Sequence, residues 1–198
     1  MMAIRETAYP YLRGDGVPVA SPLFQGEGGG SIPTSPLQFE FKECDVVTAC
    51  QLVSLWHSRL PRIEPGNANM YPAVFYVAEF DEGLFATAIW SQPVARLLNG
   101  RNWIELRRFA ISPQAPRNTA SRMLSWMVKD IRRKFPKVER AISYQDTEVH
   151  HGTIYKASGW TAGKESGSIG TGWNSRPRNT MQSTAPKVRW EYPLVEVE

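Results

Sequence analysis

The stretch from Trp103 to Phe135 reads WIELRRFAISPQAPRNTASRMLSWMVKDIRRKF and contains the clearest secondary-structure pattern in the chain. Residues 103–111 are typical of a strand, and the two prolines of residues 112–116 indicate a loop. From Ala120 onward, apolar residues recur at helical spacing until Pro136 ends the helix. Because a helix start carries unpaired backbone N–H groups, a strand, loop and helix in this order can accept an anion.

The helix predicted after the loop has one apolar side and one basic side. Its apolar stripe consists of Ala120, Leu124, Met127, Val128, Ile131 and Phe135, and we interpret it as core packing. At about 100° per residue, Arg122, Lys129 and Arg133 lie on the opposite side. Asn118 or Thr119 is the candidate N-cap residue.

The segments on either side of this unit complete a mixed pattern. Alternating or apolar runs predict strands at residues 38–41, 73–79, 84–90, 140–144 and 187–192. Asp45 can cap a helix that runs to Trp56, and a short helix is expected over residues 152–158. Prolines and glycine make residues 61–67 a loop, and residues 161–172 show little pattern. We therefore predict an α/β (α+β) fold with a mixed central sheet flanked by helices.

The chain has 198 residues, which fits a single domain. Residues 1–36 are rich in proline and contain the run Gly26-Glu27-Gly28-Gly29-Gly30. No strand pattern precedes this run and no helix pattern follows it, so we interpret it as a linker and not as a phosphate loop. The expected organisation is a flexible leader over residues 1–36 and a domain over residues 37–198 with an irregular C-terminal region.

Cysteine content and hydropathy limit the class of protein. With only two cysteines, a disulfide scaffold or a four-cysteine zinc site is not expected. No apolar run is long enough for a membrane span, and the N-terminus has no apolar core of a secretory signal. We expect a cytoplasmic protein with no membrane partner.

Positive charge is concentrated in one part of the chain. The formal net charge is +4, whereas residues 101–140 alone carry eleven basic and three acidic side chains. A basic block suits a polyanion such as nucleic acid or the phosphates of a nucleotide-like cofactor. A solvated helix face is the alternative interpretation.

Four groups of residues could carry chemistry. The first is the helix start, where Arg117, Asn118, Thr119, Ala120 and Ser121 could bind a cofactor phosphate through backbone N–H groups. Its order resembles the pyrophosphate loop of GNAT acetyltransferases, with Ala120 and Arg122 at positions where that family has small residues. An ordinary helix cap is the alternative.

The second group follows the strand at residues 140–144. Asp146 stands at the end of that strand, where α/β sheets gather ligands, and Tyr144, His150, His151 and Tyr155 are close in sequence. A carboxylate beside imidazole and phenol groups can perform general acid–base catalysis or hold a metal. The alternatives are surface histidines and an aspartate that only caps the next helix.

The third and fourth groups are His57 and Arg108. His57 ends a helix before a proline-containing loop, where it could carry a proton or act as a cation at the helix C-terminus. By strand alternation, Arg108 is expected to share a face with Ile104, Leu106 and Ala110. A guanidinium there needs an anion, either a carboxylate such as Asp146 or a substrate or DNA phosphate.

Together these stretches resemble the Mom family of phage DNA-modification proteins over roughly residues 50–160. The resemblance rests on Trp56-His57-Ser58, Glu105-Leu106-x-Arg108, Ala115–Arg122, Ser143-Tyr144-x-Asp146, His151–Tyr155 and Gly159-Trp160. The family's functional positions fall on His57, Ser58, Arg108, Ser121, Asp146 and Tyr155. This chain differs from the pattern in its leader, in Arg59 and in its tail.

The resemblance implies a divergent GNAT fold and an enzyme that acts on duplex DNA in the host bacterial cytoplasm. It implies transfer of an acetamido (carbamoylmethyl) group to N6 of adenine, which protects phage DNA from restriction. The implied partners are double-stranded DNA and a small-molecule donor. An acyl-CoA-type donor fits the fold, and iron is also admitted, with Asp146, His57 and Tyr155 as conceivable ligands.

In this scheme the target base leaves the duplex, and phosphate contacts from Arg117, Arg122, Lys129 and Arg133 hold the strand. Asp146 could accept a proton from the exocyclic amine. Two alternatives remain. One is a GNAT N-acyltransferase that acts on a small amine or a protein, and the other is a nucleic-acid-binding protein without enzymatic activity.

Overall fold

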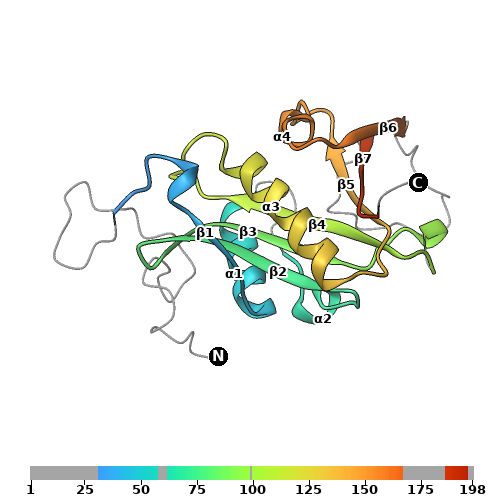
Figure 1. The fold of residues 1–198 in the computed structure, drawn as a ribbon, viewed down its shortest axis with the longest axis horizontal. Helices are drawn as coiled ribbons and strands as arrows, with labels where there is room; N and C mark the ends of the chain where they lie inside the picture. The colour runs from blue at the N-terminus through green and yellow to red at the C-terminus, as the bar shows by residue number, and fades with distance from the viewer. Residues whose placement is uncertain (1–30, 58–61, 99, 167–185, 196–198) are drawn as a thin grey trace, which may run out of the picture.

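The computed structural model describes residues 31–57, 62–98, 100–166 and 186–195. Seven strands within these residues form one sheet in the order β1-β2-β3-β4-β5-β7-β6 (Figure 1). They are β1 (Glu40–Glu43), β2 (Val74–Phe80), β3 (Gly83–Ser91), β4 (Trp103–Ile111), β5 (Arg140–Asp146), β6 (Thr161–Ser166) and β7 (Lys187–Pro193). The helices are α1 (Val46–Trp56), α2 (Pro65–Ala68), α3 (Thr119–Lys134) and α4 (Thr153–Ala157), with 3-10 turns η1 (Pro36–Gln38) and η2 (Arg96–Leu98).

The sheet divides between β4 and β5. These two strands are parallel and pair over only four positions, from Trp103 with Arg140 to Leu106 with Ser143. The other neighbouring strands pair antiparallel. Beyond Leu106 and Ser143 the two strands diverge, and β5, β7, β6 and α4 form a separate arm (Figure 1). The divergence leaves a split at the carboxyl ends of β4 and β5, where ligands bind in many open α/β sheets.

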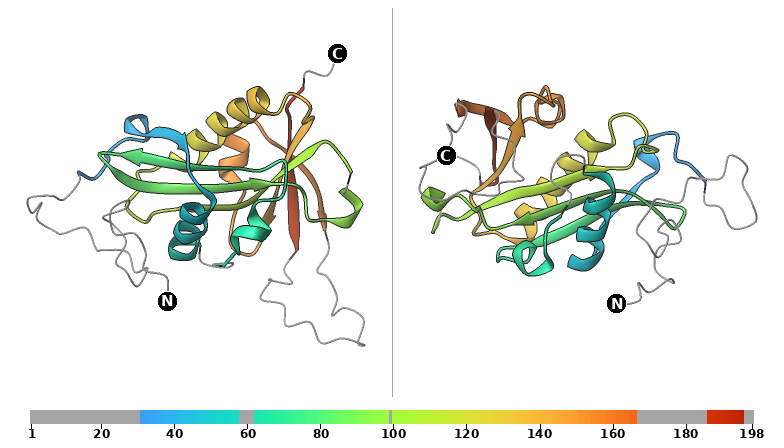
Figure 2. Two further views of the ribbon diagram at one scale, coloured as in Figure 1. Left: turned by 90° about the horizontal axis from the view of Figure 1, so that it is seen from below. Right: turned by 180° about the vertical axis from the view of Figure 1, so that it is seen from behind.

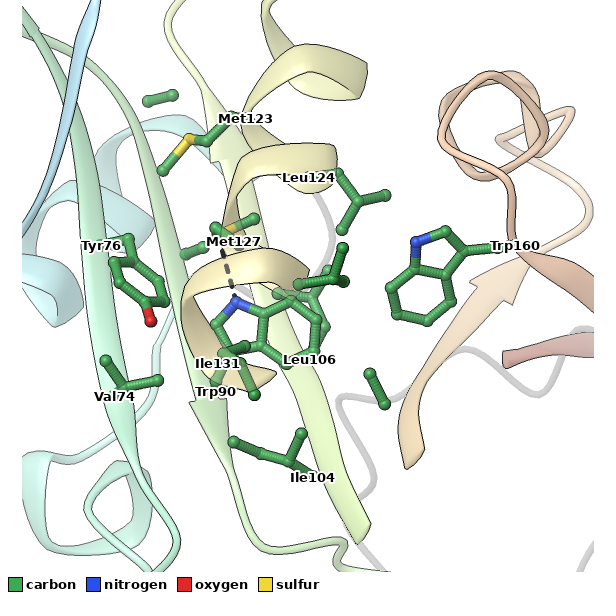
Figure 3. Close-up of a cluster of buried hydrophobic side chains, with 14 of the residues drawn as sticks. Val74, Tyr76, Trp90, Ile104, Leu106, Met123, Leu124, Met127, Ile131 and Trp160 are labelled. Atoms are coloured by element: carbon green, nitrogen blue, oxygen red, sulfur yellow. Dashed lines mark hydrogen bonds between the residues drawn. The ribbon is translucent and has the colours of Figure 1, made fainter. Parts of the chain in front are cut away.

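Helices cover the two faces of the sheet, as the alternation of β2 shows. Tyr76 packs in the main core with α3, whereas its neighbour Phe75 packs against α1 in a second cluster. Figure 2 shows α1 and α2 together on the face away from α3. In the main core, Trp90 donates through Nε1 to Met127 Sδ at 3.1 Å and lies beside Ile104 and Leu106 (Figure 3).

The structure confirms the strand and the helix predicted within residues 103–135. The predicted strand is β4, and the predicted helix is α3, which ends at Lys134 before Pro136. Asp45 caps α1 by accepting a 2.9 Å hydrogen bond from the Thr48 backbone N–H. The remaining predicted strands and the short helix correspond to β1, β2, β3, β5, β7 and α4.

Two local predictions are wrong, and a third holds in position only. The predicted loop at residues 61–67 contains the start of α2, which begins at Pro65 because proline suits the first turn of a helix. The patternless segment after Trp160 contains β6, which pairs with β7 and so gains order from its partner strand. The predicted N-cap position is confirmed at Asn118, although its side chain makes no capping bond.

The predicted leader is described only in its last residues. Ser31 donates to the Asp81 carboxylate from both its backbone N–H and its hydroxyl, each at 2.9 Å. Residues 1–30, including the glycine run, lie outside the described residues. The division into a leader over residues 1–36 and a domain over residues 37–198 stays a prediction. Among the helices that the structure describes, none is long and apolar enough to cross a membrane.

A bulge in β4 changes the predicted environment of Arg108. Ile89 of β3 pairs with Arg108, but the next residue, Trp90, pairs with Leu106, so Arg107 is an extra residue in β4. An extra residue reverses the alternation of side chains. Ile104 and Leu106 therefore face α3, whereas Arg108 lies with Ala110 on the side of α1. Arg108 shares a face with Ala110, as expected, but not with Ile104 and Leu106.

Candidate functional site

Three basic side chains from separate segments meet on the α1 side of β4. His57 follows the last residue of α1, Arg108 lies on β4, and His150 belongs to the loop between β5 and α4. Burial of the half-buried His57, together with the charges of Arg108 and His150, lowers its pKa to about 4. The three groups are therefore near enough for their charges to act on one another, with His150 on the exposed side. At neutral pH the His57 imidazole is uncharged and can accept a proton.

Glu105 is a buried carboxylate next to this cluster. Its side chain is 8% exposed and accepts a 3.1 Å hydrogen bond from the Val94 backbone N–H. Burial raises the pKa of Glu105, while the charges of Arg107, Arg108 and Lys187 act in the opposite direction. A carboxylate with a raised pKa beside a guanidinium can hold or release a proton. Sequence reasoning did not select Glu105 as a site residue.

Arg108 is itself held among charged groups. Burial lowers its pKa, the charge of Arg107 lowers it further, and Glu105 and Cys50 raise it. Its Nη1 also donates a 2.7 Å hydrogen bond to the Arg107 carbonyl. The carboxylate that acts on Arg108 is thus Glu105, and not Asp146 as the sequence analysis offered.

Asp146 shapes the turn at the end of β5. Its half-buried carboxylate accepts a 3.1 Å hydrogen bond from the Glu148 backbone N–H, and its carbonyl accepts one from the His150 N–H at 3.1 Å. Gln145 Nε2 also donates to the His150 carbonyl. Asp146 and Gln145 therefore position the loop that carries His150 beside His57.

Tyr155 reaches the split in the sheet from α4. Its hydroxyl lies 2.8 Å from Ser143 Oγ, which lies 3.5 Å from the carbonyl oxygen of Leu106, the last β4 residue paired with β5. The ring is stacked on Trp190 with centroids 5.2 Å apart, and the side chain is 7% exposed. Burial raises the pKa of the Tyr155 hydroxyl, so it stays protonated at neutral pH and can donate a proton.

The start of α3 leaves its first backbone N–H groups without a side-chain cap. Asn118 has a left-handed backbone with a φ of 69° and makes no capping bond. The nearby hydroxyls act as donors, because Thr119 Oγ1 bonds the Pro116 carbonyl at 2.7 Å and Ser121 Oγ bonds the Asn118 carbonyl at 3.1 Å. The Thr119 N–H donates to the Pro116 carbonyl at 3.3 Å, so the first-turn N–H groups that suit an anion such as a pyrophosphate are those of Ala120 and Ser121.

A seam between α3 and α4 continues from this helix start. Ser158 Oγ lies 2.9 Å from the Ser121 carbonyl and 2.7 Å from the Ile154 carbonyl, which places α4 against α3. Trp160 extends from the end of α4 toward Leu124 of α3 (Figure 3). The Trp160 indole N–H is buried and has no hydrogen-bond partner among the described residues. A buried donor of this kind is costly unless something accepts from it.

The basic side chains predicted on α3 are confirmed as exposed. They are Arg122, Lys129 and Arg133. Arg133 forms an ion pair with Asp130, and Arg122 lies 5.8 Å from the centroid of the Phe41 ring. Because α3 and α1 cover opposite faces of the sheet, these side chains and His57 lie on different sides of it.

The described residues do not support the iron site. They contain no group of three or more histidine, cysteine, aspartate or glutamate side chains that could hold a metal ion. Two of the three conceivable ligands already make other hydrogen bonds. The Tyr155 hydroxyl pairs with Ser143 Oγ, and the Asp146 carboxylate accepts from the Glu148 N–H. We therefore assign no step to a metal.

One cavity of about 220 Å³ lies between α1 and the segment before α2. Cys50 and Ser54 line it on one side, and Arg62 and Glu64 line it on the other. The charge of Glu64 raises the pKa of the buried Cys50 thiol in addition to burial. Asp146 and Tyr155 do not contribute to this cavity.

Of the site residues predicted from sequence, the structure brings His57 and Arg108 together and places Tyr155 at the adjoining split. Asp146 supports the loop behind them, and Ser121 lies at the start of α3. Ser58 lies outside the described residues. The signal that could have identified Glu105 was its place beside two arginines in a strand with few polar residues.

Comparisons with solved structures identify the fold. The ribosomal-protein-S18-alanine N-acetyltransferase from Escherichia coli matches with a TM-score of 0.57 and 11% identity, over 81% of this chain and 96% of that chain. The same values hold for yncA from Salmonella typhimurium, a putative acetyltransferase solved with acetyl-CoA. A GNAT-family acetyltransferase from Streptococcus pneumoniae matches with a TM-score of 0.55 and 10% identity, over 78% of this chain and 98% of that chain. The chain therefore has a GNAT-like fold.

A search of curated proteins finds no significant match. The family model of the Mom protein family, in contrast, matches residues 38–188. This range includes β1 to β6, all four α-helices and the cluster around His57 and Arg108. The match confirms the resemblance on which the sequence analysis relied, and the chain belongs to the Mom protein family.

Proposed function

We propose that this protein is a GNAT-like transferase that modifies adenine in phage DNA, adding an acetamido (carbamoylmethyl) group at N6 and so protecting the DNA from host restriction. The observation that carries the proposal is the uncharged His57 imidazole near Arg108, which lies on β4 beyond its pairing with β5 and on which Glu105 also acts. Membership of the Mom family supports the same conclusion.

The proposed reaction transfers a carbon group to the exocyclic amine of an extruded base. N6 forms a bond to the carbon of the transferred group, the bond from that carbon to the donor's leaving group breaks, and a proton leaves N6. The neutral His57 imidazole is placed to take that proton, and Glu105 is a second candidate base. Arg108 would stabilise negative charge that develops on the donor.

The donor would lie along the seam that begins at the α3 N-terminus. The uncapped N–H groups of the first turn suit a pyrophosphate, and the unpartnered Trp160 N–H suits a carbonyl oxygen farther along the seam. These features fit an acyl-CoA-type donor, whose thiolate leaves from the thioester carbon. Attack by N6 on that carbon forms an N6-acyl adenine, and a carbamoylmethyl product requires a later isomerisation that moves the bond of N6 to the methylene carbon. Because Ser158 contacts the Ser121 carbonyl, entry of the donor requires α4 to move away from α3.

The test is nucleoside mass spectrometry of DNA from cells that express the protein. We expect a heavier deoxyadenosine derivative with the wild type and its loss with His57→Gln, at equal amounts of soluble folded protein. Lys137→Gln, an exposed change outside the site, is the matched control and should keep the modification. An unmodified nucleoside profile with folded wild-type protein would refute the proposal.

A second candidate function is acyl transfer from acyl-CoA to a small amine or a protein, which the uncapped α3 N-terminus favours. Calorimetry with acetyl-CoA tests it. Binding without any DNA modification would favour this candidate, and absence of binding would exclude it.

A further inference from the structure

Three arginines surround the ring of the buried Trp103. The guanidinium carbons of Arg101, Arg140 and Arg189 lie 4.9, 5.0 and 5.7 Å from the ring centroid. We call Trp103 and these three arginines the Trp103 arginine cluster. The cluster joins three segments, because Arg101 precedes β4, Arg140 begins β5 and Arg189 lies on β7.

The cluster lies on the same face of the sheet as Arg108 and Glu105. Trp103 and Glu105 are two residues apart in the regular part of β4, ahead of the bulge. Ile142 is buried against Trp103, which places Arg140 and Tyr144 on that face of β5 by alternation. On β7, Arg189 pairs with Tyr144. The face therefore runs from the His57 and Arg108 cluster across β5 to β7.

This face is open to solvent where β5 and β7 form it. The side chains of Arg140 and Arg189 are 41% and 37% exposed, and Tyr144 is 37% exposed. The helix α1 packs against β2, β3 and β4, and α2 packs against α1 and β3. An exposed tyrosine between basic side chains is a suitable platform for a base or a sugar next to a phosphate backbone.

The cluster carries excess positive charge in a fixed arrangement. Glu191 forms ion pairs with both Arg140 and Arg189, so one carboxylate is shared between two guanidinium groups. With Arg101 included, the cluster and Glu191 together carry a net charge of +2. Stacking on Trp103 and pairing with Glu191 restrict the arginines before a ligand binds, which lowers the entropic cost of contacting phosphate.

We propose that the Trp103 arginine cluster binds the phosphate backbone of the DNA strand whose base enters the site. The proposal rests on the proposed function, and it assigns the main phosphate contacts to β4, β5 and β7 in place of α3. The reason is position, because the cluster shares a face with Arg108, whereas Arg122 and Lys129 lie beyond the other face of the sheet. A duplex that delivers a base to Arg108 approaches the face that carries the Trp103 arginine cluster.

The experiment measures the affinity of the full chain for a fluorescent duplex by anisotropy at several salt concentrations. Arg101→Gln with Arg189→Gln should weaken binding more than tenfold at low salt and reduce the slope of log Kd against log salt by about 2, since each phosphate contact contributes about 0.9. Arg101→Lys with Arg189→Lys keeps the charges and should recover most of the slope. Thermal unfolding confirms that each variant is folded.

Two matched double variants remove the same charge elsewhere. Lys137→Gln with Lys156→Gln, both exposed, should change the affinity less than twofold. Arg122→Gln with Lys129→Gln tests the α3 side. If that pair loses the salt dependence while Arg101→Gln with Arg189→Gln retains wild-type affinity and slope, the cluster is not the DNA surface.

The result is independent of the modification assay. If the wild type binds duplex DNA through the cluster but leaves its nucleosides unmodified, the surface stands and the proposed function fails. Suppose instead that the wild type modifies DNA, and that the double variant Arg101→Gln, Arg189→Gln binds the duplex with the same affinity and modifies it at the same rate. In that case the function stands and the surface proposal is overturned. A folded wild type that binds no duplex at low salt also overturns it.

Discussion

At the scale of single residues, the protonation of His57 determines what the site can do. Burial, with help from the charges of Arg108 and His150, lowers its pKa to about 4. An NMR titration of the imidazole should therefore give a midpoint near 4, with the ring neutral from pH 5 upward. Substitution of Arg108 by Gln should raise that midpoint. A midpoint at the ordinary value of 6.5 in the folded protein would contradict the proposed environment.

The same shift affects stability. Between pH 6.5 and about 4 the unfolded chain binds a proton at His57 that the folded chain does not bind, so acidification over this window favours unfolding. His57→Gln should reduce the loss of stability across that window, and urea unfolding at pH 7 and pH 5 measures it. If the variant and the wild type lose stability equally, His57 does not contribute to the pH dependence.

The hydrogen bond between Tyr155 and Ser143 predicts different losses of stability when one or the other side chain is removed. Tyr155→Phe removes the buried hydroxyl and should cost about 1 kcal/mol, whereas Ser143→Ala leaves that hydroxyl without its 2.8 Å partner and should cost about 2 kcal/mol. Urea unfolding provides both values. A proton-donating role for Tyr155 also requires that Tyr155→Phe abolish modification while the protein stays folded. Equal stability of both variants and the wild type would show that the contact does not exist in solution.

At the same scale, the sequence predicted residue types better than their partners. His57 and Arg108 were selected, and the structure brings them together. Asp146 was offered as one possible anion for Arg108, beside a substrate or DNA phosphate, but the carboxylate that acts on Arg108 is Glu105, because the two share a strand and a face after the bulge. His150 was a candidate beside Asp146 with a surface histidine as the alternative; the structure leaves it exposed, on a loop that Gln145 and Asp146 hold in place.

At the scale of elements, the bulge in β4 decides which side chains enter the site. Deletion of Arg107 removes the extra residue, restores regular alternation and leaves Arg108 facing α1. This variant should fold cooperatively, with a modest loss from the contact that Arg107 makes with the Asn67 carbonyl. Deletion of Phe109 should instead turn the side chains that follow in β4 to the opposite face of the sheet and so prevent cooperative folding. Circular dichroism on heating distinguishes the two, and equal disruption by both deletions would contradict the register.

Elements with their own periodicity or end signals were predictable, and elements that depend on partners were not. The amphipathic pattern of α3 and the cap of α1 are local features, and both appear as expected. The strand β6 has no distinctive pattern and exists because β7 supplies its hydrogen-bond partners. The bulge is also invisible in the sequence, because it arises from the pairing of β4 with β3.

At the scale of the whole molecule, the fold is two parts joined along four residue pairs of β4 and β5. The main core spans this junction, with Trp90 and Ile104 on one side and Tyr155 and Trp190 on the other. The position of the arm determines how close His150 comes to His57. The mixed sheet and its helices were predictable from the order of elements, whereas this division follows from where two strands stop pairing.

Gly152 is the residue at which a single methyl group should disturb the arm. An added Cβ would lie 2.4 Å from Trp190 Cζ2 and 2.6 Å from Gln145 Oε1, and the Trp190 ring has little room to shift because it is stacked on Tyr155. Gly152→Ala should cost about 3 kcal/mol, combining a left-handed backbone with steric overlap.

Gly159 provides the matched control for this prediction. It also has a left-handed backbone, but the nearest atom to an added Cβ is 3.9 Å away, so Gly159→Ala should cost only about 1 kcal/mol. Hydrogen exchange should show loss of protection in β5 and β7 for Gly152→Ala, with β2 and β3 unchanged. The proposed DNA modification should fall with it, because the same segment carries His150. If both variants unfold at the same denaturant concentration and protect β7 equally, the contact of Gly152 with Trp190 does not hold the arm in place.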